Sequence, residues 1–317
     1  MTGHVGIAAI AYAFAGPQVT VRQLAAAGRL ESAPEVLEGF GFDTVHVAGR
    51  ETPYDLALDC SRRALRDAGV APAEVGLLIH GGATGEAAFA PGGGAAGCPG
   101  PSFRFPSTRL QHALELDDAW TFGLDQMACT NLLAAIRVGA GLMRAEGIRR
   151  ALCVTSEFFG PGAPRERIYN CVSDAACAVL LDRDAPGCRL VAAVQVTKGY
   201  YWDAEAARDE VVASYFPTSR HVIERTLERA GWSAASVDWV IPHNVSARSW
   251  AILGGLLRLP RARVWIDNIA RRGHTLAGDN LINLRDALDA GHINPGERLL
   301  LFSYGYGAHW TALAVEA

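Results

Sequence analysis

Three side chains in this sequence have the types and surroundings of a nucleophile and its proton carriers. Cys129 lies in DQMACTNLLAAI, directly before an amphipathic run, while His243 in IPHNVSARSW and His274 in RRGHTLAGDN follow far downstream. A thiol at the start of a helix meets the positive end of the helix dipole and free N–H groups, which favour the thiolate. Imidazoles gain and lose protons near neutral pH. We therefore predict that Cys129 attacks a substrate while the two histidines handle protons and charge.

The position of Cys129 on a turn distinguishes it from other cysteines of the chain. Cysteine is usually a small buried side chain, and we interpret four others in this way: Cys60, Cys153, Cys177 and Cys188. Residues 125–130 form a short transition from a strand-like stretch into a predicted helix. This position favours a functional role for Cys129, and a buried structural cysteine is the alternative.

The two histidines and a glycine-rich segment each have a functional and a structural interpretation. His243 follows the strand-like VDWVI, and α/β sheets collect functional side chains where parallel strands end. His274 lies in a glycine-flanked turn before a predicted helix, so a purely structural turn is its alternative. The segment FSYGYGAHW, residues 302–310, offers closely spaced N–H groups for an oxyanion hole, or else forms a tight β-turn.

Composition and charge limit the class of protein. The chain has 317 residues, of which 50% are apolar and 20% charged, so it can bury a sizeable core. A net charge of -4 argues against a nucleic-acid partner. The seven cysteines include no CxxC pair and favour reduced thiols in the cytoplasm. The N-terminus has no charged signal-peptide region, and no apolar run is long enough to cross a membrane.

Strand-like and helix-like runs alternate along the chain, which predicts an α/β protein. The expected strands cover residues 5–12, 75–80, 151–156, 176–181, 190–197, 237–242, 263–266, 298–303 and 310–315. The expected helices cover residues 52–68, 131–146, 219–230, 246–257 and 278–290. Thr52 and Pro53 are a typical helix start, with a hydroxyl at the cap and proline at the first helical position.

The chain also contains an internal repeat. LRDAGVAPAEVGLLI, residues 65–79, and LERAGWSAASVDWVI, residues 227–241, share their pattern and several identical residues. A helix end, a turn and a strand form a common combination, so chance is one explanation. Equivalent positions in two halves favour a duplication. We expect an N-terminal half at residues 1–170 and a C-terminal half at 171–317.

The stretch of residues 81–106 breaks the alternation. It is rich in glycine and proline and has no period. We interpret it as an insertion that is either a surface loop or a lid or interface element.

The motifs together resemble those of the β-ketoacyl-ACP synthase III group of thiolase-fold condensing enzymes. ACTNLLAAI, SDAACAVLL, DWVIPHN, RRGHT and the tail PGERLLLFSYGYG follow in the order of that group, from about residue 5 to the end. The resemblance implies a five-layered αβαβα fold made of two duplicated halves, usually as a homodimer. It agrees with the repeat found in the chain itself.

The resemblance also implies roles for individual residues. Cys129 corresponds to the acyl-accepting nucleophile and His243 to a catalytic imidazole, and backbone N–H groups of Cys129 and Tyr306 correspond to the oxyanion hole. Three further positions correspond to substrate or carrier binding: Phe105, which reaches toward the neighbouring subunit, Asn244, and Arg248 at the tunnel mouth. No metal is expected.

Four departures from the group change the expected chemistry. His274 replaces an asparagine, which makes the set Cys129–His243–His274 similar to that of elongating ketosynthases. Glu35 and Gly39 occupy the places of the tryptophan and arginine that clamp the adenine of coenzyme A, so a carrier-bound donor is favoured. The insertion is longer than in the group, and Tyr306 replaces the middle glycine of a GGG turn, which narrows the site.

The expected function is acyl transfer through a thioester on Cys129. We favour decarboxylative Claisen condensation with a malonyl-carrier thioester in fatty-acid or polyketide-type metabolism. The alternative is transfer of the acyl group to an O, N or S acceptor without decarboxylation. The substrates are the phosphopantetheine thioester of acyl carrier protein or coenzyme A, with no other cofactor. Asp279 either orients His274 or takes part itself.

Two other protein classes fit less well. A papain-like hydrolase also has cysteine before histidine, but the flanking motif and the strand–helix repeat do not suit it. A silent partner of an active ketosynthase would usually have lost the nucleophile, whereas Cys129 and His243 are both present.

Overall fold

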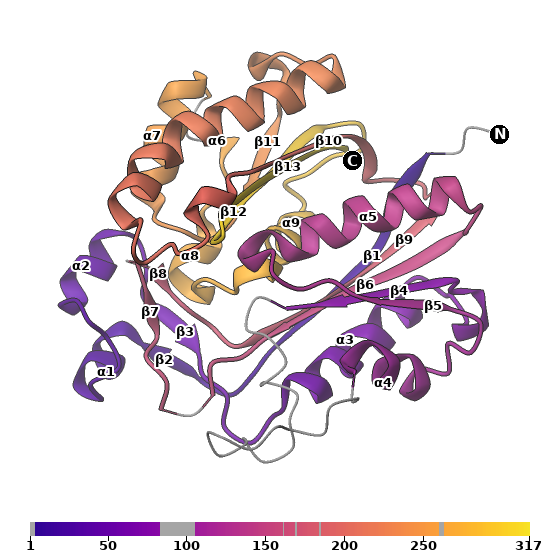
Figure 1. Ribbon diagram of the computed structural model, residues 1–317, viewed down its shortest axis with the longest axis horizontal. Helices are drawn as coiled ribbons and strands as arrows, with labels where there is room; N and C mark the ends of the chain where they lie inside the picture. The colour runs from indigo at the N-terminus through magenta and orange to yellow at the C-terminus, as the bar shows by residue number, and fades with distance from the viewer. Residues whose placement is uncertain (1–3, 83–104, 161, 169, 184, 260–262) are drawn as a thin grey trace.

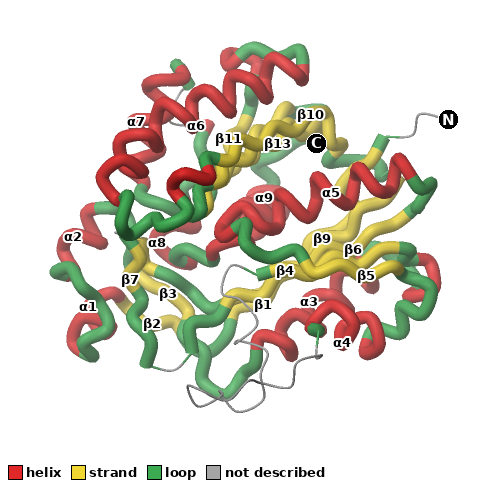
Figure 2. The backbone as a smooth tube through the Cα atoms, viewed as in Figure 1, coloured by secondary structure: helices red, strands yellow, loops and turns green. Residues whose placement is uncertain are grey.

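The structure is a computed structural model that describes residues 4–82, 105–160, 162–168, 170–183, 185–259 and 263–317 (Figures 1 and 2). Almost all of the predicted insertion at 81–106 lies outside these residues. None of the helices in the described ranges is long and apolar enough to cross a membrane.

The first half of the chain builds a group of five strands. Their order is β1 (Val5–Phe14), β9 (Ala175–Arg183), β6 (Arg150–Glu157), β4 (Leu77–Gly81) and β5 (Trp120–Gly123). β4 pairs in parallel with β5 and β6, while β9 runs antiparallel to both β6 and β1. β4 and β6 are buried along their length, as expected for parallel strands covered on both faces.

The second half repeats this order and these directions. β10 (Arg189–Thr197), β13 (His309–Glu316), β12 (Arg298–Gly305) and β11 (Trp239–Pro242) follow one another, with β11 parallel to β12 and β13 antiparallel to its neighbours. A single parallel bridge between Val240 and Val264 takes the fifth place, where a strand at 263–266 was predicted. The two groups meet along β1 and β10 in one nine-stranded sheet, through the pair Gly6–Arg189.

The strand pairing shifts the division between the halves. Because β9 pairs with β1 and β6, residues 175–183 belong to the first group. The division therefore lies between β9 and β10, later than the expected boundary after residue 170. The duplication itself agrees with the pattern in the sequence.

Helices fill three layers around the two strand groups (Figure 1). α3 (Pro53–Asp67) and α4 (Pro106–Ala113) cover the outer face of the first group, and α6 (Arg208–Ala230) and α7 (Ala247–Leu257) cover that of the second. α5 (Asn131–Ala145) and α9 (Asp279–Asp289) lie between the groups. The predicted five-layered αβαβα fold is confirmed.

The central position of α5 follows from its sequence. Its buried residues lie all around the helix rather than on one stripe: Leu132, Leu133, Ala134, Ala135, Ile136, Gly139, Ala140 and Met143. A helix that is apolar on all sides is buried between other elements. Burying each large aliphatic side chain contributes about 1.5–3 kcal/mol, so the start of α5, and Cys129 before it, is firmly held.

Short elements at one end of the layers were not predicted. They are α1 (Val21–Ala26), α2 (Pro34–Gly39), α8 (Asp267–Arg272), and the small pairs β2 (Gln18–Thr20) with β3 (Thr44–His46) and β7 (Glu166–Arg167) with β8 (Asn170–Cys171). Strands of two or three residues leave no period in the sequence. α6 also begins well before the predicted residue 219, because Pro217 is accommodated inside it.

Candidate active site

Cys129 lies on a strained turn that joins β5 to α5. It is the middle residue of a 3₁₀ turn, Ala128–Thr130, and Gln126 and Ala128 have positive φ angles of 66° and 45°. Such angles are unfavourable for residues with a Cβ, and they persist where surrounding structure enforces them, often at functional sites. Ser303 of β12 donates a hydrogen bond of 2.8 Å to the Cys129 carbonyl oxygen. The turn is thus fixed from the opposite half of the molecule.

The end of β12 packs directly on this turn. A Cβ atom on Gly305 would lie 2.5 Å from the Met127 carbonyl oxygen and 3.0 Å from the Cys129 nitrogen, so only glycine fits. Tyr306 follows at once and lines the same cavity as Cys129. The two backbone N–H groups predicted to form the oxyanion hole, those of Cys129 and Tyr306, therefore belong to segments in direct contact.

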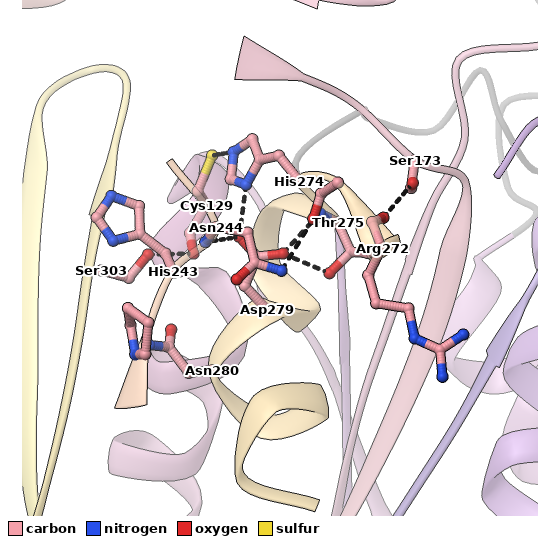
Figure 3. Close-up of polar contacts among 12 residues, drawn as sticks. Cys129, Ser173, His243, Asn244, Arg272, His274, Thr275, Asp279, Asn280 and Ser303 are labelled. Carbon is pink, nitrogen blue, oxygen red and sulfur yellow. Dashed lines mark hydrogen bonds and ion pairs between the residues drawn. The ribbon is translucent and has the colours of Figure 1, made fainter. Parts of the chain in front are cut away.

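A chain of short contacts links Cys129 to His274 and Asp279 (Figure 3). The Cys129 Sγ lies 3.3 Å from His274 Nε2, and His274 Nδ1 lies 2.5 Å from Asp279 Oδ2. Asp279, fully buried at the start of α9, also accepts hydrogen bonds from the Thr275 backbone N–H and hydroxyl at 2.6 and 2.7 Å. The backbone N–H of Asn244 donates to Asp279 Oδ2 at 2.6 Å. Asp279 thereby orients His274 toward the sulfur.

The charges beside His274 favour its protonated form. Burial by itself penalises the imidazolium, but the Asp279 carboxylate and the Cys129 thiolate outweigh burial and raise the pKa of His274 well above its usual value. At neutral pH the ring therefore carries a proton on each nitrogen. One N–H faces the aspartate and the other faces the sulfur.

His243 is in the opposite state. It follows β11, is fully buried, and its ring packs edge-on against Trp250 and Phe302, each with centroids 5.7 Å away. Burial, reinforced by the charge of His274, lowers the pKa of His243 to about 3, so the ring is neutral. Among the described residues neither ring nitrogen has a hydrogen-bond partner. The ring centroids of His243 and His274 are 6.4 Å apart, so the two imidazoles are close neighbours.

The turn that carries His274 is held by backbone contacts. His274 N–H donates to the Cys171 carbonyl at 2.8 Å, and Ser173 N–H donates to the His274 carbonyl at 2.9 Å. Gly273 before it has a φ of +64°, and a Cβ there would lie 2.5 Å from Val45 Cγ1. In the GHT sequence, the turn therefore requires the glycine for its shape, while the histidine supplies the chemistry.

The three predicted binding residues lie in different surroundings. Asn244 is 1% exposed, and its side chain donates to the Gly273 carbonyl at 2.9 Å and accepts from Asn283 at 2.8 Å. The structure corrects its predicted role, because Asn244 supports the His274 turn rather than facing a substrate. Arg248 is exposed in the first turn of α7, where Ser246 caps the helix. Phe105 is 50% exposed at the start of α4 and does not line the cavity at Cys129 within the described chain.

A cavity of 440 Å³ opens at the sulfur. This volume lies in the range of small-molecule sites. Its walls are mostly apolar or aromatic and are formed by Ala128, Cys129, Phe158, Phe159, Arg167, Asn170, Val172, Val245, His274, Leu276, Tyr304 and Tyr306. A second compartment of 200 Å³ continues between α2, α6 and α7 and shares Asn170, Val245, Tyr304 and Tyr306 with the first. Together the two compartments can hold a ligand that extends from the α2–α6–α7 side to the sulfur.

The structure also supplies residues that the sequence did not indicate. Thr275 and Asn283 complete the contacts around Asp279 and Asn244, and Ser303 holds the nucleophile turn. Arg167 and Asn170 enter the cavity wall from the short β7–β8 hairpin. Of these, Thr275 stood beside His274 and Ser303 lay in the glycine-rich segment 302–310, whereas Asn283, Arg167 and Asn170 had no signal in the sequence. In the part of the chain that the structure describes, no cluster of three His, Cys, Asp or Glu side chains could hold a metal ion.

Comparisons with known proteins show what the chain resembles in sequence. Residues 227–317 match the family model described as 3-oxoacyl-[acyl-carrier-protein (ACP)] synthase III C terminal. A β-ketoacyl-[acyl-carrier-protein] synthase III from Rhizorhabdus wittichii is 28% identical over 301 residues, which cover 89% of each chain.

Two solved structures show the same fold. The 3-oxoacyl-[acyl-carrier-protein] synthase III from Aquifex aeolicus superimposes with a TM-score of 0.84 at 20% identity, over 99% of this chain and 100% of that one. ChlB3, described as an acyltransferase, gives 0.86 at 22% identity, over 99% and 98%. The chain is thus similar in sequence to β-ketoacyl-[acyl-carrier-protein] synthase III enzymes, and it shares the fold of their solved structures.

Proposed function

We propose that the protein is an acyltransferase that loads an acyl group on Cys129 and condenses it with a malonyl thioester, with loss of carbon dioxide. One observation carries the proposal. Cationic His274 contacts the Cys129 sulfur in the wall of one cavity, and the ring of neutral His243 lies with its centroid 6.4 Å from that of His274. Relatives named β-ketoacyl-[acyl-carrier-protein] synthase III support the same chemistry, and a structural neighbour described as the priming β-ketosynthase of the R1128 polyketide pathway supports a role in fatty-acid or polyketide-type metabolism.

The first step is thioester exchange. The Cys129 thiolate attacks the acyl carbonyl, a bond forms between Sγ and carbon, and the bond to the carrier sulfur breaks. His274 gives its proton to the leaving carrier thiolate. Backbone N–H groups of Cys129 and Tyr306 would stabilise the tetrahedral oxyanion, and losing one such donor commonly costs about 3–4 kcal/mol.

The second step needs donors for an enolate. When the malonyl thioester loses carbon dioxide, negative charge develops on its thioester oxygen. The Cys129 thiolate has by then become a neutral thioester, but Asp279 still favours the cationic form of His274, which regains a proton from solvent. Neutral His243, with a pKa of about 3, is a poor base at neutral pH and serves as an N–H donor. The carbanion then attacks the acyl carbon, and collapse of the intermediate releases the Cys129 thiolate.

A second function is favoured by a different observation. Cys129, His274 and Asp279 form a nucleophile–base–carboxylate chain, the arrangement used for acyl transfer on unrelated folds. After His274 has protonated the leaving thiol, its free Nε2 can accept a proton from an alcohol, amine or thiol that attacks the acyl-enzyme. ChlB3, the structural neighbour described as an acyltransferase, is consistent with this alternative.

Intact-mass measurement followed by a divided second step tests the proposal. We expect an acyl thioester to add one acyl group to the wild type and none to Cys129→Ala. The isolated acyl-enzyme is then mixed with malonyl-carrier or with hydroxyl and amino acceptors. Release of carbon dioxide in step with a β-keto product supports condensation. Deacylation by acceptors without carbon dioxide refutes condensation and leaves the alternative.

We further propose that the donor is carried by acyl carrier protein rather than by free coenzyme A, and that no other cofactor takes part. Glu35 of α2 is paired with Arg22 at 3.3 Å, so this helix offers no cation for an adenine or a diphosphate at that position. Exposed Arg248 on α7 provides positive charge beside the outer compartment for an acidic carrier. Loading rates from acyl-carrier and acyl-CoA, compared in wild type and Arg248→Glu, test both points.

We also propose a homodimer. β5 ends the sheet, and its Trp120 and Phe122 are 50% and 42% exposed, which is unusual for an edge strand left in water. A second copy of the strand would cover these side chains, and Phe105 lies in the helix packed beside β5. Light scattering should give twice the mass of 33.7 kDa, and Trp120→Lys should shift it toward the monomer.

A further inference from the structure

One wall of the catalytic cavity carries an arginine that the proposed mechanism does not use. Arg167 lines the compartment that contains Cys129 and His274, and its guanidinium lies over the ring of Phe159, 5.4 Å from the centroid. Phe159 lines the same compartment. The charge of Arg167 also acts on the hydroxyl of Tyr306, a third residue of this wall. The guanidinium therefore faces the cavity rather than the outer solvent alone.

This cation has no acidic partner in the described part of the chain. Within the described residues its side chain donates one hydrogen bond, to the neighbouring Glu166 carbonyl at 2.9 Å. By contrast, Arg165 two residues earlier is fully buried and paired with Asp174 at 2.6 Å. Arginine presents five donors in a planar fork that matches a carboxylate. Placed in a wall otherwise formed mainly by apolar and aromatic groups, Arg167 is suited to an anion that arrives with the substrate.

Asn170 stands beside Arg167 as a second polar group. The two residues are register partners in the β7–β8 hairpin, and Asn170 lines both compartments of the cavity. Its side chain makes no hydrogen bond within the described ranges. An amide N–H next to a guanidinium gives three or more donors for one planar anion.

The hairpin holds these groups at a fixed place relative to the catalytic residues. Val172, just after β8, forms a parallel bridge with His274, and the backbone of Cys171 accepts from His274 N–H. On the other side Glu166 accepts hydrogen bonds from Ser32 and from the Glu31 backbone at 2.6–2.9 Å. Arg167 and Asn170 are therefore placed with the precision that ligand selection requires.

We propose that Arg167, assisted by Asn170, binds a carboxylate at the distal end of the acyl group, so that the protein prefers monothioesters of dicarboxylic acids. The inference rests on the proposed acylation of Cys129. In that step the bond from Sγ to the acyl carbon forms, the carrier thiol leaves with the proton of His274, and the distal carboxylate is retained on Arg167 unchanged.

The position of Arg167 favours an acyl carboxylate over a carrier phosphate. Arg167 shares a compartment with the sulfur, whereas the phosphate of a phosphopantetheine arm lies at the opposite end of that arm from the thioester. A carboxylate a few carbons beyond the reacting carbonyl lies within the same compartment of 440 Å³.

Four substrates distinguish binding of the acyl carboxylate from binding of the carrier phosphate. Succinyl and butyryl groups are each presented on N-acetylcysteamine, which has no phosphate, and on phosphopantetheine. The rate of Cys129 acylation is followed by intact mass, and the measured quantity is the succinyl-to-butyryl ratio of rates within each variant, so that a general loss of activity cancels. In Arg167→Met this ratio should fall by about 10–100-fold, the value of a charge-assisted hydrogen-bond pair, with either carrier.

Three further variants complete the test. Asn170→Asp places a carboxylate beside Arg167 and should lower the ratio even if Arg167→Met folds poorly, while Arg167→Lys should restore part of it. Arg225→Met removes an exposed arginine of α6 outside the cavity and should leave the ratio unchanged.

The outcomes distinguish the inference from the function on which it rests. If butyryl loads on wild-type Cys129 but the succinyl-to-butyryl ratio is the same in wild type and in Arg167→Met, the inference fails and the proposed function stands. A loss in Arg167→Met that follows the phosphate and ignores the acyl group assigns Arg167 to the carrier arm and overturns the inference. If no thioester acylates Cys129, the proposed function fails first.

Discussion

The substitution Asp279→Asn tests the support of His274 most directly. Asp279 is fully buried and accepts four hydrogen bonds, from His274 Nδ1, the Asn244 N–H, and the N–H and hydroxyl of Thr275. Asparagine has the same shape but one acceptor oxygen and an NH₂ group, which must face at least one of these donors. Burial of the imidazole remains while the carboxylate that outweighs it is lost, so the pKa of His274 falls.

The magnitude follows from the change of charge. A hydrogen bond to a charged group contributes about 1.5–3 kcal/mol, against about 0.5–1.5 kcal/mol for a neutral one. The His274–Asp279 bond alone thus loses about 1–2 kcal/mol, or roughly tenfold in rate. Where the amide NH₂ turns to His274, the ring is held in the tautomer that cannot accept a proton from the thiol, which adds a larger loss. We expect Cys129 acylation at neutral pH to fall by about 10²–10³-fold.

Two measurements check this expectation. Intact-mass kinetics give the acylation rate, and NMR of ring-labelled histidine gives the pH at which His274 titrates. The folded-state pKa of His274 is raised, so its charged form contributes stability that is complete below the unfolded pKa and is lost as the pH rises through the folded value. In Asp279→Asn that loss should move to lower pH. Asp289→Asn, at the exposed end of the same helix, is the matched control.

A result within threefold of the wild-type rate, together with an unchanged His274 titration, would show that Asp279 does not set the state of the imidazole. The Cys129–His274–Asp279 chain would then be a structural network only.

Three further predictions concern other parts of the site. Gly305→Ala should lower activity by at least tenfold and stability by about 1–3 kcal/mol, because its Cβ would lie 2.5 Å from the Met127 carbonyl oxygen. Kinetics and thermal unfolding measure the two effects, and wild-type activity together with wild-type stability would contradict the packing argument. His243→Gln, which keeps an N–H donor, should retain more condensation activity than His243→Leu, and equal activity in the two variants argues against a donor role. Because the pKa of His243 is about 3, its ring should show no titration by NMR between pH 5 and 8. Arg165→Met should destabilise the fold by about 3–5 kcal/mol because it leaves Asp174 buried without its partner. Denaturant unfolding measures this loss, and an unfolding midpoint equal to that of the wild type would contradict it.

The fold was predictable where the sequence repeats or alternates. The segments 65–79 and 227–241 each join a helix to a strand, α3 to β4 and α6 to β11, so one visible repeat indicated the duplicated order of the whole sheet. The four-residue β5 and the two-residue strands β7 and β8 are too short to leave a period, and their places depend on partners far along the chain.

The site was predictable in its chemistry but only partly in its contacts. Cys129, His243 and His274 were expected from residue type and local turns; in the structure Cys129 and His274 line one cavity, and the ring centroid of His243 lies 6.4 Å from that of His274. The role expected for Asn244 was wrong because residue type does not tell which way a side chain points after a strand end; here it points inward to Gly273. Arg167 and Asn170 gave no local signal, since their meaning depends on a hairpin that packs against the His274 turn.

The origin of the contacts around Cys129 has a consequence for the newly made chain. The thiol meets His274 across 145 residues of sequence and Ser303 across 174 residues. During synthesis from the N-terminus, Cys129 leaves the ribosome well before either partner exists, and contacts of such long range form late in folding. The thiol therefore stays an ordinary cysteine until β12 has joined the sheet. Folding of the second half of the sheet, rather than synthesis of the Cys129 turn, is therefore the event that gives the thiol its partners.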